Sequence, residues 1–271
     1  MIKTTRYTSL AVLLPAFSAG ISPGALHAAD EVPILEEIVV TATRRAQTIS
    51  EVPLAISAFT GTQLQNRGIT DVQDLSAVSS SLLITTGPSE LSGTEVRIRG
   101  VGTTGSNPGL EPSVGILVDN VYRSRTGLAV GDLLDIASVE ILRGPQGTLF
   151  GRNTSAGTIG IYTLKPEFEF GGYGEGTAQN YNGYVVSGGV TGPIIDDTLA
   201  FRIAASYNKR DGYVSDSLVP SREMYGRDRE TAKGQLLWRP TENIDVRMIV
   251  DYQHKDEDCC SSNYAIVGPT G

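Results

Sequence analysis

The C-terminal part of the chain alternates apolar and polar residues with a period of two. Four apolar residues share one parity between positions 199 and 207: Leu199, Phe201, Ile203 and Tyr207. The alternation recurs in residues 184–190 and 244–252 and, less regularly, in residues 231–238. Because successive side chains of a β-strand point to opposite faces, this pattern predicts strands with one apolar and one polar face. Such segments are typical of transmembrane β-strands, whose apolar face contacts lipid.

The connections between these segments also favour a membrane protein. Residues 193–197 and 239–243 form short turns, whereas residues 209–230 form a long polar connection. Outer-membrane barrels combine short periplasmic turns with long outer loops. Following the strands up and down places Trp238 near the inner rim and four tyrosines near the outer rim, as in aromatic girdles: Tyr181, Tyr184, Tyr207 and Tyr252. A soluble β-sandwich with one polar face is the alternative interpretation.

Residues 49–166 predict a mixed α/β fold instead. Short apolar runs indicate strands at residues 52–59, 114–118, 139–142 and 159–163. Alternation of apolar and basic residues indicates another at residues 96–99. Helices are predicted at residues 60–67, 71–78 and 128–135, and Gly68 is expected to end the first of them. These elements carry enough apolar residues for a compact domain of their own.

Residues 1–28 have the order of a secretory signal peptide. Lys3 and Arg6 precede an apolar run at residues 10–19, and small residues follow it. This run is about half as long as the ~20 residues that a membrane-spanning helix needs. We therefore expect export from the cytoplasm, with cleavage near Ala28 or Ala29. Residues 29–47 are expected to form an extended, flexible segment.

Composition and charge exclude several functions. The 271 residues carry a formal net charge of −8, which argues against a broad nucleic-acid-binding face. His254 is the single histidine after the predicted cleavage site, and the two cysteines, Cys259 and Cys260, are adjacent. These residues allow no convincing Ser-His-Asp triad, zinc site or disulfide framework. We expect neither enzymatic activity nor a cofactor.

Three sequence blocks resemble the plug domain of TonB-dependent outer-membrane receptors. They are VRIRGVG (96–102), VDNVYRSR (118–125) and IASVEILRGPQGTLFGRNTSAGTIGIYTLKP (136–166). The segment EEIVVTATRR (36–45) is similar to a TonB box with its linker. The resemblance extends from about residue 36 to residue 271 and is most specific in residues 140–160.

The resemblance implies a fold and a function. The expected fold is an α+β plug domain followed by antiparallel transmembrane β-strands, an incomplete part of a 22-stranded barrel. Residues 1–28 would be the signal peptide, 29–47 the TonB box and flexible linker, 48–166 the plug, and 171–271 the first barrel strands. Such receptors lie in the outer membrane of Gram-negative cells and import scarce nutrients, often ferric siderophores. The implied partners are the inner-membrane TonB complex, a small-molecule or metal-chelate ligand and outer-membrane lipid, but no nucleic acid.

The motifs also imply residues for each role. The TonB box would comprise Ile38, Val39, Val40, Thr41 and Ala42, a β-prone peptide that could add as a strand to a partner's sheet edge. By analogy with the family, Arg99 and Arg143 would join the plug to acidic residues of the barrel wall, most of them beyond residue 271. The plug loops that could face a ligand contain Thr103, Thr104, Ser106, Asn107, Arg123 and Arg125.

The length of the chain departs from the family pattern. About 100 residues follow the predicted plug, whereas 22 strands of ~9–11 residues need over ~200 residues before loops. We therefore expect a fragment or a truncated reading frame of a longer receptor. The alternative is a plug-type periplasmic protein that binds a ligand or transduces a signal without transport activity. The sequence does not identify the ligand.

Overall fold

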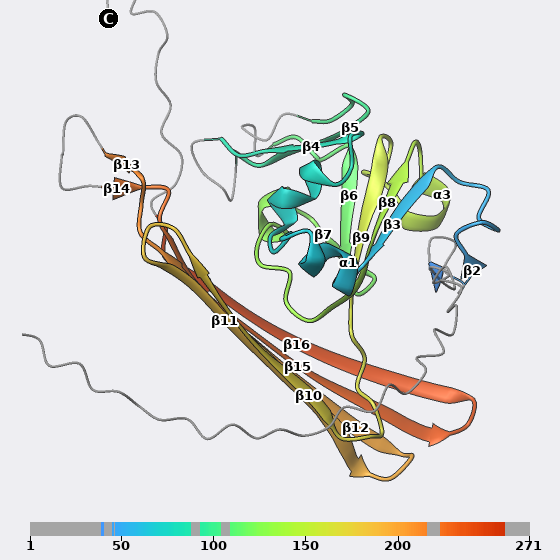
Figure 1. The fold of residues 1–271 in the computed structure, drawn as a ribbon. Coiled ribbons are helices and arrows are strands. Elements are labelled where there is room, and N and C mark those ends of the chain that lie inside the picture. The colour runs from blue at the N-terminus through green and yellow to red at the C-terminus, as the bar shows by residue number, and fades with distance from the viewer. Residues whose placement is uncertain are drawn as a thin grey trace, which may run out of the picture. The chain divides into compact units, whose positions relative to one another are not determined.

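The structure has two parts, an α+β region at residues 47–163 and a long antiparallel sheet at residues 171–255 (Figure 1). It is a computed structural model and describes residues 39–40, 45, 47–87, 93–103, 109–215 and 223–257. All of these belong to one compact unit, residues 37–271. The predicted signal peptide lies outside the described residues, as do Cys259 and Cys260.

A five-stranded sheet forms the centre of the α+β region, in the order β3-β8-β9-β6-β7. Its strands are β3 (Ile56–Thr60), β6 (Val114–Val118), β7 (Val121–Arg123), β8 (Ile136–Arg143) and β9 (Gly157–Thr163). Strands β6 and β9 are parallel, and the other neighbouring pairs are antiparallel. Asp119 and Asn120 make the tight turn between β6 and β7, both with positive φ, which these residue types tolerate.

Short helices with side-chain caps connect these strands. Helix α1 (Gly61–Asn66) begins at Thr60, whose hydroxyl accepts a hydrogen bond from the Gln63 amide at 3.2 Å. The Gln63 side chain accepts one from the Thr60 amide in return, which completes a capping box. The 3-10 helix η1 (Val72–Ala77) is capped in the same way by Asp71 and Asp74. Both elements occur where the sequence predicts helix.

Smaller elements complete the region. They are η2 (Thr126–Leu128), α3 (Gly147–Phe150) and the hairpin of β4 (Leu82–Thr85) with β5 (Glu95–Ile98). The short strand β1 (Val39–Val40), which precedes the region, pairs with β2 (Gln47–Thr48). Another short pair, β13 (Val214–Ser215) with β14 (Glu223–Met224), lies in a connection between two strands of the long sheet.

The predicted helix at residues 128–135 is wrong. After η2 this loop forms no helix, and Asp135 has a φ of 59°. Its backbone bonds to the segment before η1 instead: the Val72 amide donates to the Gly131 carbonyl at 3.1 Å, and the Leu133 amide donates to the Thr70 carbonyl at 2.8 Å. These tertiary bonds replace the helical ones that the local sequence predicts.

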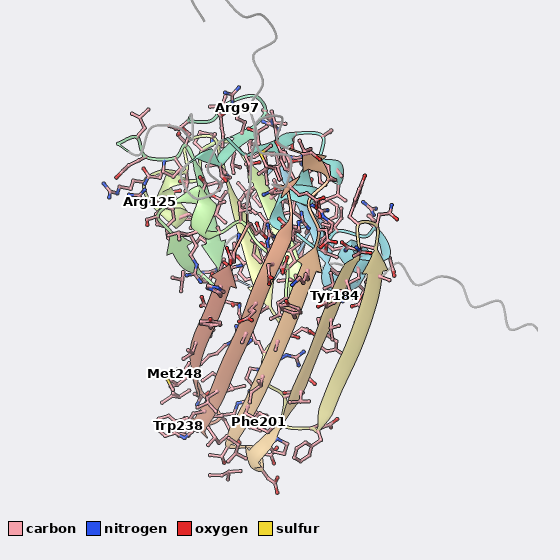
Figure 2. The ribbon with its side chains drawn as sticks, turned by 90° about the vertical axis from the view of Figure 1, so that its left-hand side faces the viewer. Arg97, Arg125, Tyr184, Phe201, Trp238 and Met248 are labelled. Carbon is pink, nitrogen blue, oxygen red and sulfur yellow. The ribbon has the colours of Figure 1, made fainter. Side chains whose placement is uncertain are left out.

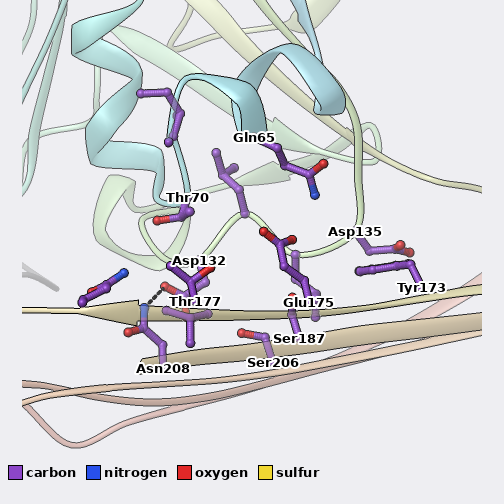
Figure 3. Close-up of a pocket in the computed structure, with 16 residues that line it drawn as sticks. Gln65, Thr70, Asp132, Asp135, Tyr173, Glu175, Thr177, Ser187, Ser206 and Asn208 are labelled. Carbon is purple, nitrogen blue, oxygen red and sulfur yellow. Dashed lines mark hydrogen bonds between the residues drawn. The ribbon is translucent and has the colours of Figure 1, made fainter. Parts of the chain in front are cut away.

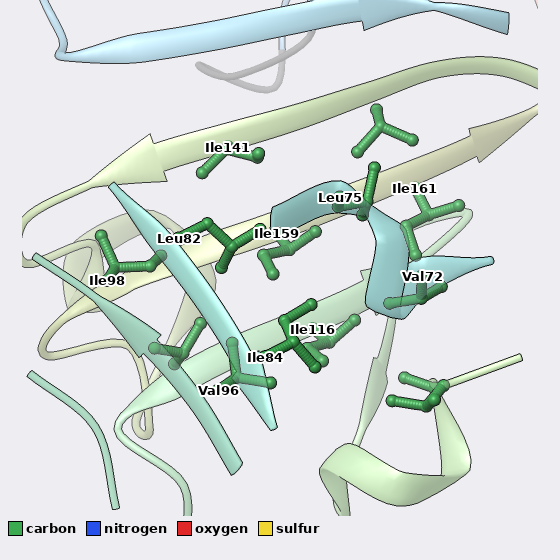
Figure 4. Packing of buried hydrophobic residues seen from close by; sticks show 14 of the residues in the cluster. Val72, Leu75, Leu82, Ile84, Val96, Ile98, Ile116, Ile141, Ile159 and Ile161 are labelled. Atoms are coloured by element: carbon green, nitrogen blue, oxygen red, sulfur yellow. The ribbon is translucent and has the colours of Figure 1, made fainter. Parts of the chain in front are cut away.

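The apolar core lies on both faces of the five-stranded sheet. The larger cluster packs η1 and the β4–β5 hairpin against one face, where Leu75, Ile98, Ile141 and Ile159 are fully buried (Figure 4). A smaller cluster on the other face contains Leu117, Leu142 and Phe150. Alternation along β8 supplies both clusters, with Ile141 in the first and Leu142 in the second.

The long sheet is a continuous up-and-down antiparallel sheet in the order β10-β11-β12-β15-β16. Its strands are β10 (Gly171–Gln179), β11 (Gly183–Ile195), β12 (Leu199–Arg210), β15 (Arg227–Thr241) and β16 (Ile244–Lys255). Strand β10 has no counterpart among the predicted elements. Glycine at positions 172, 174 and 176 removes the apolar side chains by which alternation is recognised.

The two faces of the long sheet differ in polarity. On one face large apolar side chains are exposed, such as Ile203, Met248 and Val250. Figure 2 shows Tyr184 towards one end of the strands and Phe201 and Trp238 towards the other, as the girdle pattern predicts. We call this side the apolar face and the opposite side the polar face. None of the helices among the described residues is both long and apolar enough to cross a membrane.

Candidate functional site: an ionic interface between the α+β region and the long sheet

Basic side chains of the long sheet are gathered on its polar face. On β12 and β15, Arg202 is opposite Gln235, and Asn208 is opposite Arg229. On β16, Lys255 is opposite Arg229 as well. The period-two alternation that exposes apolar residues on one face therefore brings these cationic and amide groups to the other. All of them contact the α+β region.

A buried ion pair joins Arg202 to Asp135. The guanidinium donates two hydrogen bonds of 2.6 Å, one to each carboxylate oxygen. The two side chains are 7% and 0% exposed. Asp135 sits in the 131–135 loop, and its carbonyl accepts a hydrogen bond from the Leu164 amide at 2.9 Å. A buried, two-bonded Arg–Asp pair is strongly oriented, and removing either partner leaves an uncompensated charge.

Arg229 is the centre of a larger ionic cluster. Its side chain is 2% exposed and donates to Asp71, to Glu257 and, at 3.4 Å, to Asp132. Asp71 also caps η1, since its other oxygen accepts from the Gln73 amide at 2.8 Å. The Arg229 guanidinium thus connects the start of η1, the 131–135 loop and Glu257, which follows β16.

The same cluster perturbs a neighbouring acid in the α+β region. Burial raises the pKa of the Asp74 carboxyl, and the nearby charge of Asp71 raises it further. Asp74 accepts a hydrogen bond from the Asp71 amide at 3.2 Å. Two carboxylates, those of Asp71 and Asp74, therefore lie close together at the start of η1, and Arg229 supplies compensating charge through Asp71.

Asp119 forms a third contact from the β6–β7 turn. It accepts from the Thr163 amide and hydroxyl at 3.0 and 2.8 Å, which fixes the carboxylate. Lys233 and Arg247 of the long sheet each approach it at 3.4 Å. Arg247 also donates to the Thr163 hydroxyl at 2.9 Å. The carboxylate thus serves both the turn and the interface.

Most ion pairs described between the two parts have the charges reversed from the pairs predicted for Arg99 and Arg143. The α+β region contributes carboxylates from Asp71, Asp119, Asp132 and Asp135, and the long sheet contributes cations. Sequence reasoning missed these four aspartates. One feature of the sequence could have indicated them. Basic residues recur at the polar positions of the strands, and a buried basic side chain needs an acidic partner. A contact of the opposite sense joins Arg123 to Asp251 at 3.2 Å.

The two arginines predicted to reach the barrel wall make their described hydrogen bonds within the α+β region. Arg143 donates to the carbonyls of Ala55 and Ile56 at 3.3 and 3.0 Å, within the α+β region. Arg99 is exposed, has a φ of 53°, and its amide donates to the Ser81 carbonyl at 2.7 Å. Among the described residues neither guanidinium pairs with an acid of the long sheet, and their expected barrel partners stay a prediction.

The residues predicted to face a ligand are only partly described. Thr103 and Ser113 share a hydrogen bond of 2.6 Å between their hydroxyls, and Arg125 is exposed. Arg123 is engaged by Asp251, so its guanidinium belongs to the interface. Thr104, Ser106 and Asn107 lie outside the described residues.

The predicted TonB box is described at two positions. Val39 and Val40 form β1 and pair with Thr48 and Gln47. The Val40 side chain is 1% exposed and belongs to the smaller apolar cluster. At Val40 the chain is therefore folded against the α+β region, which differs from the flexible segment expected there. Ile38, Thr41 and Ala42 lie outside the described residues.

The described residues offer no resident metal centre. No group of three or more His, Cys, Asp or Glu side chains within them could hold a metal ion. The acids of the interface are instead occupied by arginine and lysine. The site is therefore an ionic attachment of one part of the chain to another.

Comparison with known proteins identifies this arrangement. Residues 48–158 match the family of the TonB-dependent receptor plug domain. The chain is 30% identical over 190 residues to the pesticin receptor of Yersinia pestis, which covers 70% of this chain and 28% of that protein. It is 26% identical over 239 residues to the ferrioxamine B receptor of Salmonella typhimurium, covering 84% and 31%.

Solved structures share the fold. The ferric yersiniabactin uptake receptor of Yersinia pestis gives a TM-score of 0.64 at 26% identity, over 70% of this chain and 29% of that chain. The pyoverdine outer membrane receptor of Pseudomonas aeruginosa gives 0.65 at 20% identity, over 79% and 30%. The predicted fold class, an α+β plug followed by antiparallel barrel strands, is confirmed.

In this chain an α+β region is attached by ion pairs to the polar face of a sheet whose other face is apolar. This is the arrangement of a plug domain against a barrel wall, as in outer-membrane uptake receptors. Residues 48–158 belong to the plug-domain family of the TonB-dependent receptors, as the sequence motifs predict, and the chain is similar over most of its length to receptors of that class. It spans about three tenths of the length of the curated relatives that it matches.

Proposed function

We propose that the protein containing this chain imports a ferric siderophore across the outer membrane, with energy from the inner-membrane TonB complex. The observation that carries this proposal is the docking of a plug by buried ion pairs on the polar face of a sheet whose other face is apolar. An ionic interface can hold a pore closed and still release without exposing apolar surface. Relatives named for ferrioxamine B and ferric yersiniabactin support the ligand class.

The TonB box at residues 38–42 is the proposed point of energy input. Strand addition to a partner requires free backbone donors and acceptors. Because Val40 is buried and β1 is paired with β2, this segment has to leave the plug before it can pair with another protein. We assign the role of export to the signal peptide at residues 1–28. The segment up to residue 47 would act as a tether once β1 has separated from β2.

The outer parts of the plug are the proposed ligand side. This role falls to Thr103, Thr104, Ser106, Asn107 and Arg125, of which Thr103 and Arg125 are described. Arg99 and Arg143 are proposed to contact parts of the barrel wall that this chain does not contain. Arg123 stays at the interface, through Asp251.

The test compares Val40→Pro with Val40→Ala in the complete receptor. Both variants remove the buried side chain, but only proline removes the backbone N–H and fixes φ. Cells lacking other siderophore receptors are given iron-labelled ferrioxamine B, yersiniabactin or pyoverdine, with and without TonB. We expect one of these chelates to bind to the unaltered receptor and to both Val40 variants. Its uptake should fall to background in Val40→Pro and in cells without TonB, and persist in Val40→Ala.

Two outcomes would contradict the proposal. Normal uptake by Val40→Pro would show that residues 38–42 are a linker. Binding of a chelate without uptake by the unaltered receptor would favour a ligand-binding or signal-transducing protein.

A further inference from the structure

A cavity of about 250 Å³, lined by both polar and apolar side chains, lies between the α+β region and the first three strands of the long sheet (Figure 3). One wall consists of the segment between α1 and η1 together with the 131–135 loop. The opposite wall consists of polar-face side chains of β10, β11 and β12, among them Thr177, Ser187 and Ser206. At roughly 30 Å³ per water, the space suits several waters or a small organic molecule.

The charges that line this cavity are of one sign. Asp132, Asp135 and Glu175 contribute carboxylates, and no lysine or arginine is among its described lining residues. Asp135 is paired with Arg202, and Asp132 shares Arg229 with other acids. Glu175 is exposed and has no such partner among the described residues. A recess lined by one sign of charge concentrates ions of the other sign.

Two buried oxygens at this wall lack a hydrogen-bond donor. Asn208 is 1% exposed and donates to one oxygen of Asp132 at 3.0 Å. The amide oxygen of Asn208 and the second oxygen of Asp132 are buried and have no hydrogen-bond partner among the described residues. Figure 3 shows this pair at the edge of the cavity. Buried acceptors of this kind are normally satisfied, so they indicate a donor from outside the chain.

We propose that this cavity binds a small organic cation carrying a primary ammonium group. An ammonium offers three N–H donors and a positive charge, which match the two acceptors and the carboxylate lining. Hydroxyl and amide groups of the strands can receive the polar remainder of such a molecule. An anion would be repelled by the same acids. Water is the competing occupant. An ammonium differs from water in that it would protect a cysteine in the cavity from labelling.

The proposal deepens the proposed function and rests on it in one respect. If a solute passes between the plug and the wall, a path along β10–β12 leads it past these acids. A cationic solute, or a cationic end of one, would then be favoured over an anionic one of similar size. The binding of an ammonium group itself does not require transport.

The experiment measures the reactivity of a cysteine placed in the cavity of the complete, purified receptor. Ser187→Cys is made in a background with Cys259→Ser and Cys260→Ser. Its labelling rates with trimethylammonium-ethyl and sulfonatoethyl methanethiosulfonate are each divided by the rate with free cysteine. We expect a normalised preference for the cationic reagent of about ten-fold, the lower end for charge-lined clefts. Millimolar 1,4-diaminobutane should slow labelling several-fold, whereas sodium chloride of equal ionic strength should not.

Three variants make the result specific. Glu175→Gln and Asp132→Asn should each lower the preference and weaken the protection by diaminobutane. Glu169→Gln, an exposed acid outside the cavity, should change neither. Because Asp132 also contacts Arg229, Glu175→Gln provides the decisive comparison if Asp132→Asn does not fold.

Equal normalised rates without protection by diaminobutane would mean that the cavity holds only water, and would overturn the proposal. A preference for the anionic reagent would overturn it as well. Charge preference and protection in a receptor that imports no siderophore would sustain this site and refute the proposed function. Siderophore import without charge preference or protection by diaminobutane would sustain the proposed function and refute this site.

Discussion

At the scale of single residues, three aspartates of the plug serve local structure and long-range attachment together. Asp71 caps η1 and binds Arg229. Asp119 and Asp135 occupy turns with positive φ and bind cations of the long sheet. Aspartate tolerates these backbone conformations because its short side chain can bond locally. The same residue type that turns the chain therefore also supplies the charge of the interface.

The Arg202–Asp135 pair offers a test at this scale. Arg202→Met leaves the Asp135 carboxylate buried without its partner, which costs about 3–5 kcal/mol for a fully buried pair. Asp135→Asn keeps a residue suited to positive φ and leaves Arg202 without a charge partner. Because the double variant removes both charges, we expect it to lose less stability than the sum of the single variants. Calorimetry of the plug transition in the complete receptor measures all four proteins.

Additive losses would show that the two side chains act independently despite their two 2.6 Å hydrogen bonds. Arg239→Met is the control, since this arginine pairs with Asp245 on an exposed turn of the long sheet. Exposed pairs contribute little, about 0–1 kcal/mol.

At the scale of elements, the long sheet is organised by its two faces. Cross-strand register keeps apolar residues together, as where Ile203 of β12 is opposite Gly234, which is itself opposite Val250 of β16. A shift of one residue in any strand would bring its basic side chains to the apolar face. The ionic contacts with the plug thus reinforce the register that the apolar face requires.

Two matched substitutions test the assignment of the faces. Ile203→Lys places a charge on the apolar face, and Ile249→Lys places the same charge on the polar face opposite Gln235. In lipid, the first should cost about 2–4 kcal/mol near the bilayer centre and less towards its edges. We expect less folded Ile203→Lys receptor in the outer membrane and near-normal amounts of Ile249→Lys, measured by heat-modifiable migration on gels. Equal yields would contradict a lipid-facing apolar side.

At the scale of the whole molecule, the interface between plug and sheet is polar. Its contacts are ion pairs and hydrogen bonds, such as Lys255 to the Val130 carbonyl at 2.7 Å. The apolar clusters of the plug are formed within the plug itself. Separation of the two parts therefore exposes charges that water can solvate, whereas the apolar face of the sheet always needs lipid or detergent.

This difference predicts how the two parts behave when expressed alone. Residues 48–166 should be soluble and at least partly folded, because they carry their own core and present carboxylates where the sheet was. Residues 29–271 should aggregate or require detergent, because the exposed apolar face and the outermost strands have no partner. Size exclusion and circular dichroism decide between these outcomes. A clean soluble monomer of residues 29–271 would contradict the membrane assignment.

Local sequence patterns determined most elements of this protein. The turn at Asp119 and Asn120, the caps at Thr60 and Asp71, and the alternation in β12 and β16 depend on near neighbours, so they can be recognised without tertiary information. The family motifs add the plug and the barrel class, because they record a particular way of packing that local rules do not contain.

Tertiary structure alone decided the interface. Whether an aspartate is solvated or buried against an arginine depends on which segments meet, and Asp135 and Arg202 are 67 residues apart in sequence. The same holds for residues 128–135, where bonds to Thr70 and Val72 replace helical ones. It holds also for Val40, which is buried in a cluster that contains distant residues such as Phe150. Alternation in the sequence showed which face of β11, β12 and β16 is polar, and only the fold determined what that face binds.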